Sequence, residues 1–517
     1  MQLIQRILNY LNRRKRKMRL RKRLADYDLT TILVPISIIF IFGALFILFP
    51  LSSKKVLMNI RFFLGNELGS YYVILALLFF GASMYTAFSN IGKIKLGNID
   101  RPQYSTLKWG TMIFTSTMSA DIIFYSLSEW MMYANEPFIK NRAGGIQTWS
   151  LTYSLFHWGP LAWGFYIMLA VAFGYMLYVK GNNKQKFSEA CRPLLGNKVD
   201  GLFGKIIDLI AIFALIAGTA TTFSVSMPLL ATSVSHIFGV PNSRVLSIIM
   251  LILVALIYTL VVSFGMKGIS RMATTCIIFF LLLLSYFFFF GGQQRFIIEN
   301  GISSIGNMIQ NFVGMSTWLD PTRKSFFPQD WTIYYWSYWM VWCVATPFFI
   351  GSISKGRTLK DMILGAYGFG LSGTYISFVI LENYGLSQQI FHKINVLSMV
   401  AKGSDYSQAI IKIFNTMPFA NLGLLLLTIT MTGMYATVFD SITMVISTYS
   451  YKKLDVGKEP SRGIRIFWSF IFILFPIALL FSKNSIYSLQ SVSIISAFPI
   501  GFIMCLILIS FFKDVRK

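Results

Sequence analysis

Residues 331–342 read WTIYYWSYWMVW and open an apolar segment that continues to about residue 353. Seven of these twelve side chains are aromatic. The whole segment is long enough to cross a bilayer, since a membrane-spanning helix needs about 20 apolar residues. At about 1.5 Å per residue, the aromatic run is roughly 18 Å long and extends well past one headgroup layer. This stretch therefore predicts a spanning helix that carries aromatic side chains toward the bilayer centre.

The rest of the chain has the composition of an integral membrane protein. Of its 517 residues, 55% are hydrophobic and only 13% are charged, too few charges to cover a soluble protein of this size. The formal net charge is +26, a value that would also suit a nucleic-acid-binding protein. The basic residues, however, fall between the apolar segments and in the tail before them, which is the positive-inside pattern. We therefore expect a lipid bilayer as the partner and no nucleic acid.

Twelve apolar runs have the length of a membrane span and are bounded by polar residues, Gly or Pro. Residues 296–315 are too polar to span, and their Ile, Met and Phe residues recur at helical spacing, which predicts an interfacial amphipathic helix. The twelve runs lie near 31–50, 70–90, 110–133, 150–178, 206–236, 243–264, 272–291, 331–353, 362–385, 418–448, 464–482 and 489–512.

Lys and Arg predict the orientation of the chain. They are concentrated in the N-terminal tail, in alternate loops and at the C-terminal KDVRK, so we expect both termini to be cytoplasmic in a multi-pass protein of the cell membrane. No cleavable signal peptide is apparent, because the first apolar stretch begins only near Thr31. The basic run RRKRKMRLRKR at 13–23 is either an anchor attracted to anionic lipid or simply a positive-inside signal.

Twelve helices with almost no soluble mass favour transport over a channel or an enzyme. A membrane enzyme would need a polar catalytic set, but the three histidines show no metal-ligand spacing and no Ser/His/Asp grouping is evident. An osmosensory receptor would need a cytoplasmic output segment, and only a few residues follow the last span. The four cysteines are scattered, so we expect neither disulfides nor a metal site. The histidines are His157, His236 and His392, and the cysteines are Cys191, Cys276, Cys343 and Cys505.

The aromatic residues of 331–342 divide into two groups by position. Spacings of four and three place Tyr335, Trp339 and Trp342 on one helix face, with Tyr338 beside them. We assign Tyr338, Trp339 and Trp342 to a pathway. The outer members belong to an interfacial aromatic belt or to packing, and they are Trp331, Tyr334 and Trp336.

A second aromatic set lies in FHWGPLAWGFY at 156–166 and contains Trp158, Trp163 and Tyr166. The Gly-Pro pair after Trp158 removes a helix hydrogen bond and predicts a kink. Bent helices at membrane depth are tolerated where they line a cavity, and transporter sites are built in this way. The neighbouring His157 is either a hydrogen-bonded packing residue or a proton carrier.

Asp121 lies near the middle of the span 110–133. A carboxylate at the bilayer centre costs about 2.5–3.5 kcal/mol, so we expect it to face a cavity and to have a partner. The alternative is a protonated Asp that is hydrogen-bonded to a neighbouring helix. Aromatic faces and one carboxylate are what a quaternary ammonium ion needs, because it has no N–H to donate.

These motifs together resemble those of the betaine/choline/carnitine transporters. DWTIYYWSYWMVW followed by ISKGRT (353–358) is similar to that family's aromatic helix and the basic loop after it. FHWGPLAWGFY resembles its other aromatic segment, and MSADIIFYSLSE (118–129) resembles its glycine-rich helix that ends in a glutamate. The resemblance runs from about the first span to the last.

The resemblance implies an all-α membrane fold with two inverted five-helix repeats, as in LeuT-like transporters. Two extra helices at 31–90 would precede the repeats at 110–291 and 331–512, after a basic cytoplasmic tail at 1–30. It also implies a homotrimer, with the helix at 296–315 touching neighbouring subunits, and a bacterial source.

The resemblance also implies the site residues. The box for the trimethylammonium group is expected to contain Trp158, Trp163, Tyr166 and Trp339, with Tyr338 and Trp342 on an access path from outside. Met118 and Asp121 belong to the stretch that matches the family's Gly-Met-Gly-Ile-Gly run, here TMSAD. Betaine carriers of the family have glycine where Asp121 stands, and choline carriers tend to have aspartate. Since betaine and carnitine are zwitterions and choline is a net cation, we expect choline, with betaine or carnitine as the alternative.

The coupling ion is expected to be a proton, with sodium as the alternative, and no cofactor is expected. Sodium-coupled members carry two adjacent hydroxyl residues where this chain has Thr437 and Val438, and valine cannot ligate sodium. Thr219 and Thr222, in GTATTFS, could supply another sodium site together with Thr437. A titratable Asp121 would instead suit proton coupling or uniport. The implied role is secondary uptake, by a symporter of use in osmoprotection.

Overall fold

The chain is nearly all helical. The computed structural model describes residues 26–116, 119–182, 184–263, 265–402, 405–454, 458–481 and 486–516. Within these ranges there are two isolated β-bridges and no β-strand, which confirms the all-α prediction. The basic run at 13–23, predicted as an anchor or a topology signal, lies outside the described residues.

The elements up to residue 290 cover the two extra helices and the first predicted repeat. In chain order they are α2 (Leu29–Leu48), α3 (Pro50–Phe62), η1 (Phe63–Glu67), α4 (Gly69–Phe88), η2 (Asn90–Lys93), α5 (Thr106–Ser116), α6 (Ala120–Ala134), α7 (Pro137–Lys140), α8 (Gly145–His157), α9 (Pro160–Tyr178), α10 (Phe187–Ala190), α11 (Arg192–Leu195), η3 (Gly196–Asp200), α12 (Leu202–Phe238), α13 (Arg244–Ser263) and α14 (Gly265–Phe290).

The remaining elements cover the amphipathic helix and the second predicted repeat. They are α15 (Gln294–Thr317), η4 (Pro328–Thr332), α16 (Ile333–Trp342), α17 (Thr346–Ile353), α18 (Leu359–Ser377), η5 (Phe378–Glu382), α19 (Asn383–Ile390), α20 (Val396–Ala401), α21 (Tyr406–Phe414), α22 (Ala420–Tyr449), α23 (Arg462–Phe481) and α24 (Ile486–Val515).

Where the structure describes them, the twelve predicted spans are helical apart from short breaks. In the described part of the chain, ten helical segments are long and apolar enough to cross a membrane. The other two predicted spans, 110–133 and 331–353, are each divided into shorter helices, α5 with α6 and α16 with α17. The predicted boundaries differ from the observed ones by a few residues, because polar residues at the ends continue several of the helices.

The two divided helices are the first helix of each predicted repeat. α6 begins at Ala120 after a break in the helix, and α17 begins at Thr346 after a three-residue turn at 343–345. A break frees backbone groups, and at membrane depth this is tolerated only where the chain lines a cavity or is buried in protein. The break after α16 was not predicted; Pro347 in the first turn of α17 is the sequence signal for it.

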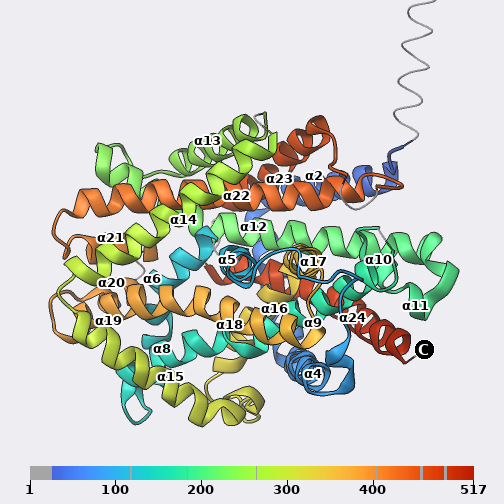
Figure 1. The fold of residues 1–517 in the computed structure, drawn as a ribbon. Helices are drawn as coiled ribbons and strands as arrows, with labels where there is room; N and C mark the ends of the chain where they lie inside the picture. Colours follow the sequence, from blue (N-terminus) through green and yellow to red (C-terminus); the bar gives the residue numbers. More distant parts are fainter. Residues whose placement is uncertain are drawn as a thin grey trace, which may run out of the picture.

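The two ends of the described chain lie on one face of the bundle, together with the loops after α9 and α22. Tyr27, near the start of the described chain, pairs with Tyr451 in the loop after α22. Lys180, after α9, forms a 3.0 Å ion pair with Asp514 near the C-terminus. Figure 1 shows both ends of the described chain at the same side of the helix bundle. We call this side the termini face.

A charged network on the termini face holds the loop after α9. Arg192 and Lys184 donate to Glu189 at 2.7 Å each, and Asn182 donates at 3.0 Å. Burial alone would raise the pKa of Glu189, but these three hydrogen bonds outweigh it and lower the pKa to about 2. The carboxylate therefore stays ionised throughout the neutral range.

The predicted amphipathic helix is α15, which packs on α8 and α19 at the outside of the bundle (Figure 1). Its inner face buries Ile297, Gly301 and Met308. Its outer face exposes an apolar row at Ile302, Ile309 and Val313, and also Ile298. Such a row can contact lipid or another subunit.

Candidate substrate site

A cavity of about 490 Å³ lies inside the bundle between α5, α6, α9, α14, α16, α17 and α22. This volume falls in the range of small-molecule sites, roughly 300–1,000 Å³. Six predicted site residues line it, namely Asp121, Trp158, Tyr166, Tyr338, Trp339 and Trp342. The cavity is therefore the candidate substrate site.

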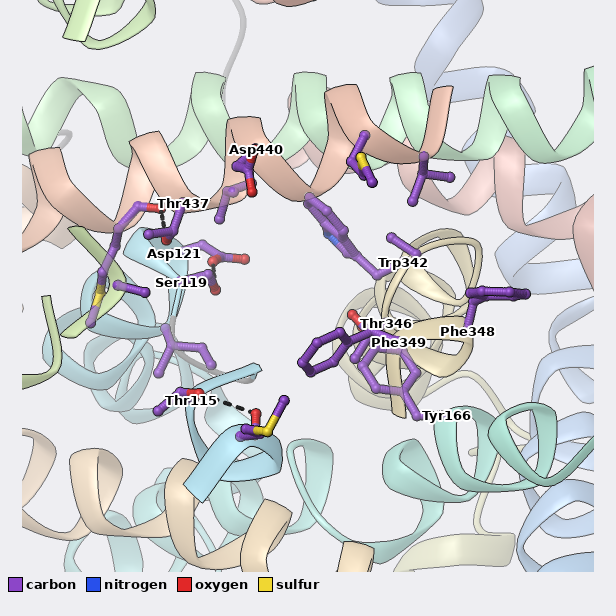
Figure 2. A pocket seen from close by; sticks show the side chains of 18 of the residues that line it. Thr115, Ser119, Asp121, Tyr166, Trp342, Thr346, Phe348, Phe349, Thr437 and Asp440 are labelled. Atoms are coloured by element: carbon purple, nitrogen blue, oxygen red, sulfur yellow. Dashed lines mark hydrogen bonds between the residues drawn. The ribbon is translucent and has the colours of Figure 1, made fainter. Parts of the chain in front are cut away.

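Two chemically different walls face each other across the cavity (Figure 2). One wall carries oxygen atoms from Ser119, Asp121 and Thr437. The other is aromatic, with Tyr166 and Trp342 among its members. An ion between these walls would meet negative charge on one side and π-faces on the other, an arrangement that suits a soft organic cation.

Asp121 occupies the first turn of α6, directly after the break in the helix. The positive end of a helix dipole favours a carboxylate in this position. Its other partners are hydroxyl groups, because Ser119 and Tyr338 both donate to its oxygens. The side chain is 3% exposed and lines the cavity, as predicted.

No cation neutralises Asp121 in the cavity. Among the described residues that line it, none is Lys, Arg or His. The other acid of the lining, Asp440, is paired with Arg465 of α23, whose guanidinium donates to its carboxylate. Asp121 is therefore the one acid in the described lining that lacks a protein counter-ion, so its carboxyl group is available to a positively charged ligand.

Trp339 lies at the centre of the predicted aromatic box. Its ring centroid is 4.7 Å from that of Tyr166, 5.6 Å from that of Trp163 and 5.7 Å from that of Trp158. The structure thus brings all four predicted members together from two segments about 180 residues apart. At these separations the rings pack directly against one another, and the open space lies beside them.

Trp163 is the box member that does not line the cavity. It is fully buried behind Tyr166 and Trp339, and its indole N–H donates to Thr374 at 3.3 Å. Gly370 makes room for the ring, because a Cβ there would come within 2.4 Å of it. In this conformation Trp163 supports the box and does not itself present a face to the cavity.

The Gly-Pro pair after Trp158 produces the predicted kink. α8 ends at His157, and Pro160 starts α9, where a proline costs no helix hydrogen bond. Gly159 is needed because a Cβ would approach the carbonyl oxygen of Leu155 to 2.5 Å. The turn leaves Trp158 at the junction, with its ring against the cavity.

Tyr338 links the acid to a second helix. Its hydroxyl donates to Asp121 and also shares a hydrogen bond with Thr222 of α12. Of the outer aromatic residues, Trp331, Tyr334 and Trp336 are all buried to at least 98%. They therefore belong to packing, and the alternative of a lipid-facing aromatic belt is wrong.

The three threonines considered for sodium do not converge on the cavity. Thr437 lines it, whereas Thr219 and Thr222 are absent from its described lining. The Thr219 hydroxyl donates within α12 to Leu215 at 2.7 Å. Met118, also predicted at the site, lies outside the described residues.

The cavity extends toward the termini face. Gln185, Ser352 and Val445 line it, and all three lie near the ends of helices that reach that face. Trp342 comes after Trp339 along α16, and therefore lies between the box and this end of the cavity. Trp342 therefore borders the path on the termini side, and the expected entry from outside past Trp342 stays a prediction.

Sequence reasoning gave no role to a buried polar cluster next to the box. Glu129 of α6 is fully buried and accepts a hydrogen bond from the Trp158 indole at 2.8 Å. His157 is buried and hydrogen-bonded to Tyr133 and Thr332, as both alternatives for it required. The signal for this cluster was the glutamate at the end of MSADIIFYSLSE.

Comparison with known proteins agrees with this geometry. The model of the betaine/carnitine/choline family of transporters matches residues 30–517. A carnitine transporter of Acinetobacter baumannii is 28% identical over 432 residues, which cover 83% of this chain and 77% of the relative. The glycine betaine transporter OpuD of Bacillus subtilis is 29% identical over 481 residues, 90% of each chain.

Among solved structures, an outward-open, substrate-bound Na⁺-coupled sialic acid symporter aligns with 89% of this chain and 87% of its own. Its sequence identity is 12% and its TM-score is 0.38, so nothing further rests on it.

A multi-helix membrane fold around a ligand-sized cavity is the architecture of a membrane transporter. The chain belongs to the betaine/carnitine/choline family of transporters, and it is not an enzyme.

Proposed function

We propose that this chain takes up choline across the cell membrane by alternating access. The observation that carries the proposal is Asp121, an acid without a cationic partner that lines the same cavity as the aromatic box. A quaternary ammonium group can bind only through its charge and through contact with π-faces. Both are available within this cavity.

Choline is favoured over its zwitterionic relatives by charge balance. The attraction of Asp121 for the trimethylammonium group of betaine is offset by repulsion of the betaine carboxylate. Choline carries no such carboxylate, and its hydroxyl can bond to hydroxyl groups of the cavity such as Thr437.

The conformation supports the release step of uptake. The cavity reaches toward the termini face, which is cytoplasmic if the Lys- and Arg-rich loops follow the positive-inside rule. Substrate would load from outside when the two repeats rock to open the opposite face, and would leave past Trp342. We infer a proton as the coupling ion, in preference to sodium, because the threonines do not gather around the cavity.

Uptake into proteoliposomes tests this function. Radiolabelled choline is supplied under an imposed proton gradient, sodium gradient or neither, and unlabelled choline, betaine and carnitine compete in parallel. Choline should be accumulated and should compete best, with stimulation by an inward proton gradient. Accumulation of betaine or carnitine with no competition by choline would refute the proposal.

Betaine or carnitine is the second candidate, supported by the similarity to a carnitine transporter and a glycine betaine transporter. One observation in the cavity also favours it. Trp339 lines the cavity, and its buried indole N–H has no hydrogen-bond partner within the described residues. A carboxylate could accept that hydrogen bond, so the competition experiment includes both zwitterions.

We further propose a homotrimer, in which the exposed row on α15 contacts the neighbouring subunit. Replacing Ile302 and Ile309 by Ser should then shift the purified protein from trimer to monomer in mass photometry. An unchanged trimer would place the contact elsewhere, and a monomeric unaltered protein would refute the assembly.

A further inference from the structure

Two glutamates are buried beside the aromatic box without a counter-ion. Glu129 of α6 and Glu382 of η5 are both completely buried. Tyr133 and Trp158 donate hydrogen bonds to Glu129 from a phenol and an indole, and the hydroxyl of Ser154 donates to Glu382. No Lys or Arg is among the donors to either carboxylate in the part of the chain that the structure describes.

The two carboxyl groups are close enough to influence each other. Ser154 lies between them, since its hydroxyl donates to Glu382 Oε1 at 3.0 Å and also lies beside Glu129. Two like charges that share a low-dielectric site cannot both ionise, so at least one of these groups must hold a proton. The pair is therefore a place where a proton is stored.

Two buried polar atoms at this place lack hydrogen-bond partners among the described residues. They are Glu382 Oε2 and the hydroxyl of Tyr335, which lies beside Glu129. Neither carboxyl group belongs to the described lining of the cavity, so no space for a hydrated metal ion is shown there. A proton is the ligand that fits, because it needs no volume and turns a carboxylate oxygen into a donor.

A chain of hydrogen bonds leads from the pair toward the face opposite the termini and ends at the buried Thr332. Tyr133 bonds to Glu129 at 2.5 Å and to His157 Nδ1 at 2.6 Å. His157 Nε2 bonds to Thr332 at 2.9 Å, at the start of α16. Chains of Asp, Glu and His inside membrane proteins are characteristic of proton relays in pumps and transporters.

The chain can move one proton without leaving any atom unpaired. With Glu129 ionised, Tyr133 donates to it, His157 donates from Nδ1 to Tyr133, and Nε2 accepts from Thr332. A proton that binds at Nε2 releases the Nδ1 proton to Tyr133, which passes its own proton to Glu129. His157 ends neutral with its proton on Nε2, so charge and protons balance.

Protonation of Glu129 acts directly on the box. Its Oε2 accepts the indole N–H of Trp158, and Trp158 lines the cavity and packs against Trp339. A hydrogen bond to an ionised acceptor is stronger than one to a neutral acceptor. Protonation of Glu129 therefore weakens the hydrogen bond that holds Trp158 at the α8–α9 junction, and deprotonation of Glu129 strengthens it.

We propose that Glu129 and Glu382 bind the proton that is transported with the substrate, and that His157 and Tyr133 deliver it from the face opposite the termini. This inference rests on the proposed transport function. Among the described residues, the titratable groups that face the pair are Tyr125 and Tyr133 on α6, His157 on α8 and Tyr335 on α16. The charged residues Arg295 and Glu299 of the nearby α15 are exposed and pair with each other at 2.9 Å.

The test uses the full chain in proteoliposomes loaded with a pH-sensitive dye, with whichever of choline, betaine and carnitine it transports. Glu382→Gln and Glu129→Gln keep the shape of each side chain but cannot gain or lose a proton. Either change should reduce substrate-driven proton entry at least about tenfold and flatten the dependence of uptake on external pH. Substrate affinity, measured by tryptophan fluorescence, should change by less than about threefold for Glu382→Gln. Glu299→Gln, an exposed acid on α15, is the matched control and should change nothing.

The outcomes separate the two proposals. If Glu382→Gln carries in protons as fast as the original protein, the pair is not the proton site. If the original protein takes up substrate without any proton entry, the pair is not the proton site either. Either result leaves choline transport standing, whereas a protein that accumulates none of the three substrates refutes the proposed function. If Glu129→Gln does not fold, Glu382→Gln and Glu382→Asp decide, because only the Asp variant should regain proton entry.

Discussion

Replacing Asp121 by Asn should weaken choline binding and leave betaine binding nearly unchanged. Asparagine has the shape of the acid. Its one oxygen can accept from one of the two hydroxyl groups, and its NH2 group can donate to the oxygen of the other, so the main effect of the change is to remove the charge. At an effective dielectric constant of about 20, unit charges about 5 Å apart attract by roughly 3 kcal/mol. Loosening one hydroxyl partner of Asp121 to admit the cation costs about 1 kcal/mol.

The net loss is then about 2 kcal/mol, which corresponds to a rise of about thirtyfold in the Kd for choline. For betaine, the attraction of Asp121 for the ammonium group and its repulsion of the carboxylate largely cancel, so we expect a change below about threefold. The selectivity for choline over betaine should therefore fall by about tenfold or more.

Isothermal titration calorimetry on the purified protein measures both Kd values directly. Ser119→Ala is the control, because it removes a hydrogen bond to the same carboxylate without removing its charge. A choline Kd within twofold of the original, or an equal loss for choline and betaine, would show that the charge of Asp121 does not select the substrate.

Three further predictions address the box, a buried ion pair and the termini face. Trp339→Leu removes a ring from the box centre and should raise the choline Kd by up to about thirtyfold, since a desolvated cation–π contact is worth about 2 kcal/mol. An unchanged Kd by calorimetry would show that Trp339 does not bind choline. Arg465→Met leaves Asp440 partly buried and unpaired, so it should destabilise the protein by about 1–3 kcal/mol in thermal unfolding. Adding Asp440→Asn should recover part of that loss. Equal melting temperatures for the unaltered protein, the single variant and the double variant would contradict this. The pKa of Glu189 is about 2, below the ordinary value of about 4.3. The ionised Glu189 therefore stabilises the folded protein fully above about pH 5, and this stabilisation is lost as the pH falls toward 2. Glu189→Gln should lower the melting temperature at pH 7 more than at pH 3.

Most of the fold could be predicted from the sequence because each span must bury its own backbone hydrogen bonds. Length and apolarity alone then mark the spans, and where the structure describes them the twelve predicted runs are helical apart from short breaks. The kink after Trp158 was equally predictable, because Gly159 and Pro160 each enforce it locally. The break at 343–345 was not predicted, since its one signal, Pro347, is tolerated in the first turn of any helix.

The candidate site was predictable as a set of residues and much less as an arrangement. The spacing of aromatic residues in 331–342 and the motif at 156–166 correctly grouped Trp158, Tyr166 and Trp339. Neither pattern predicts that Trp163 lies behind them. The partner of Asp121 was expected from the cost of burial, and the structure identifies it as hydroxyl groups. Glu382 was missed because one glutamate in an apolar run shows no pattern until η5 places it beside Ser154.

The two acids of α6 suggest how the proposed proton could be coupled to the substrate. Asp121 and Glu129 are eight residues apart, about 12 Å along one helix, so they move as one body. Asp121 is tied to α16 through Tyr338, and Glu129 is tied to the α8–α9 junction through Trp158. A cation in the cavity competes with Tyr338 for Asp121, which weakens the link between α6 and α16. A proton on Glu129 weakens its hydrogen bond with Trp158, which is the link between α6 and the α8–α9 junction. The helix is released from both neighbours only when both ligands are present, which is the condition that a coupled transporter must impose on its conformational change.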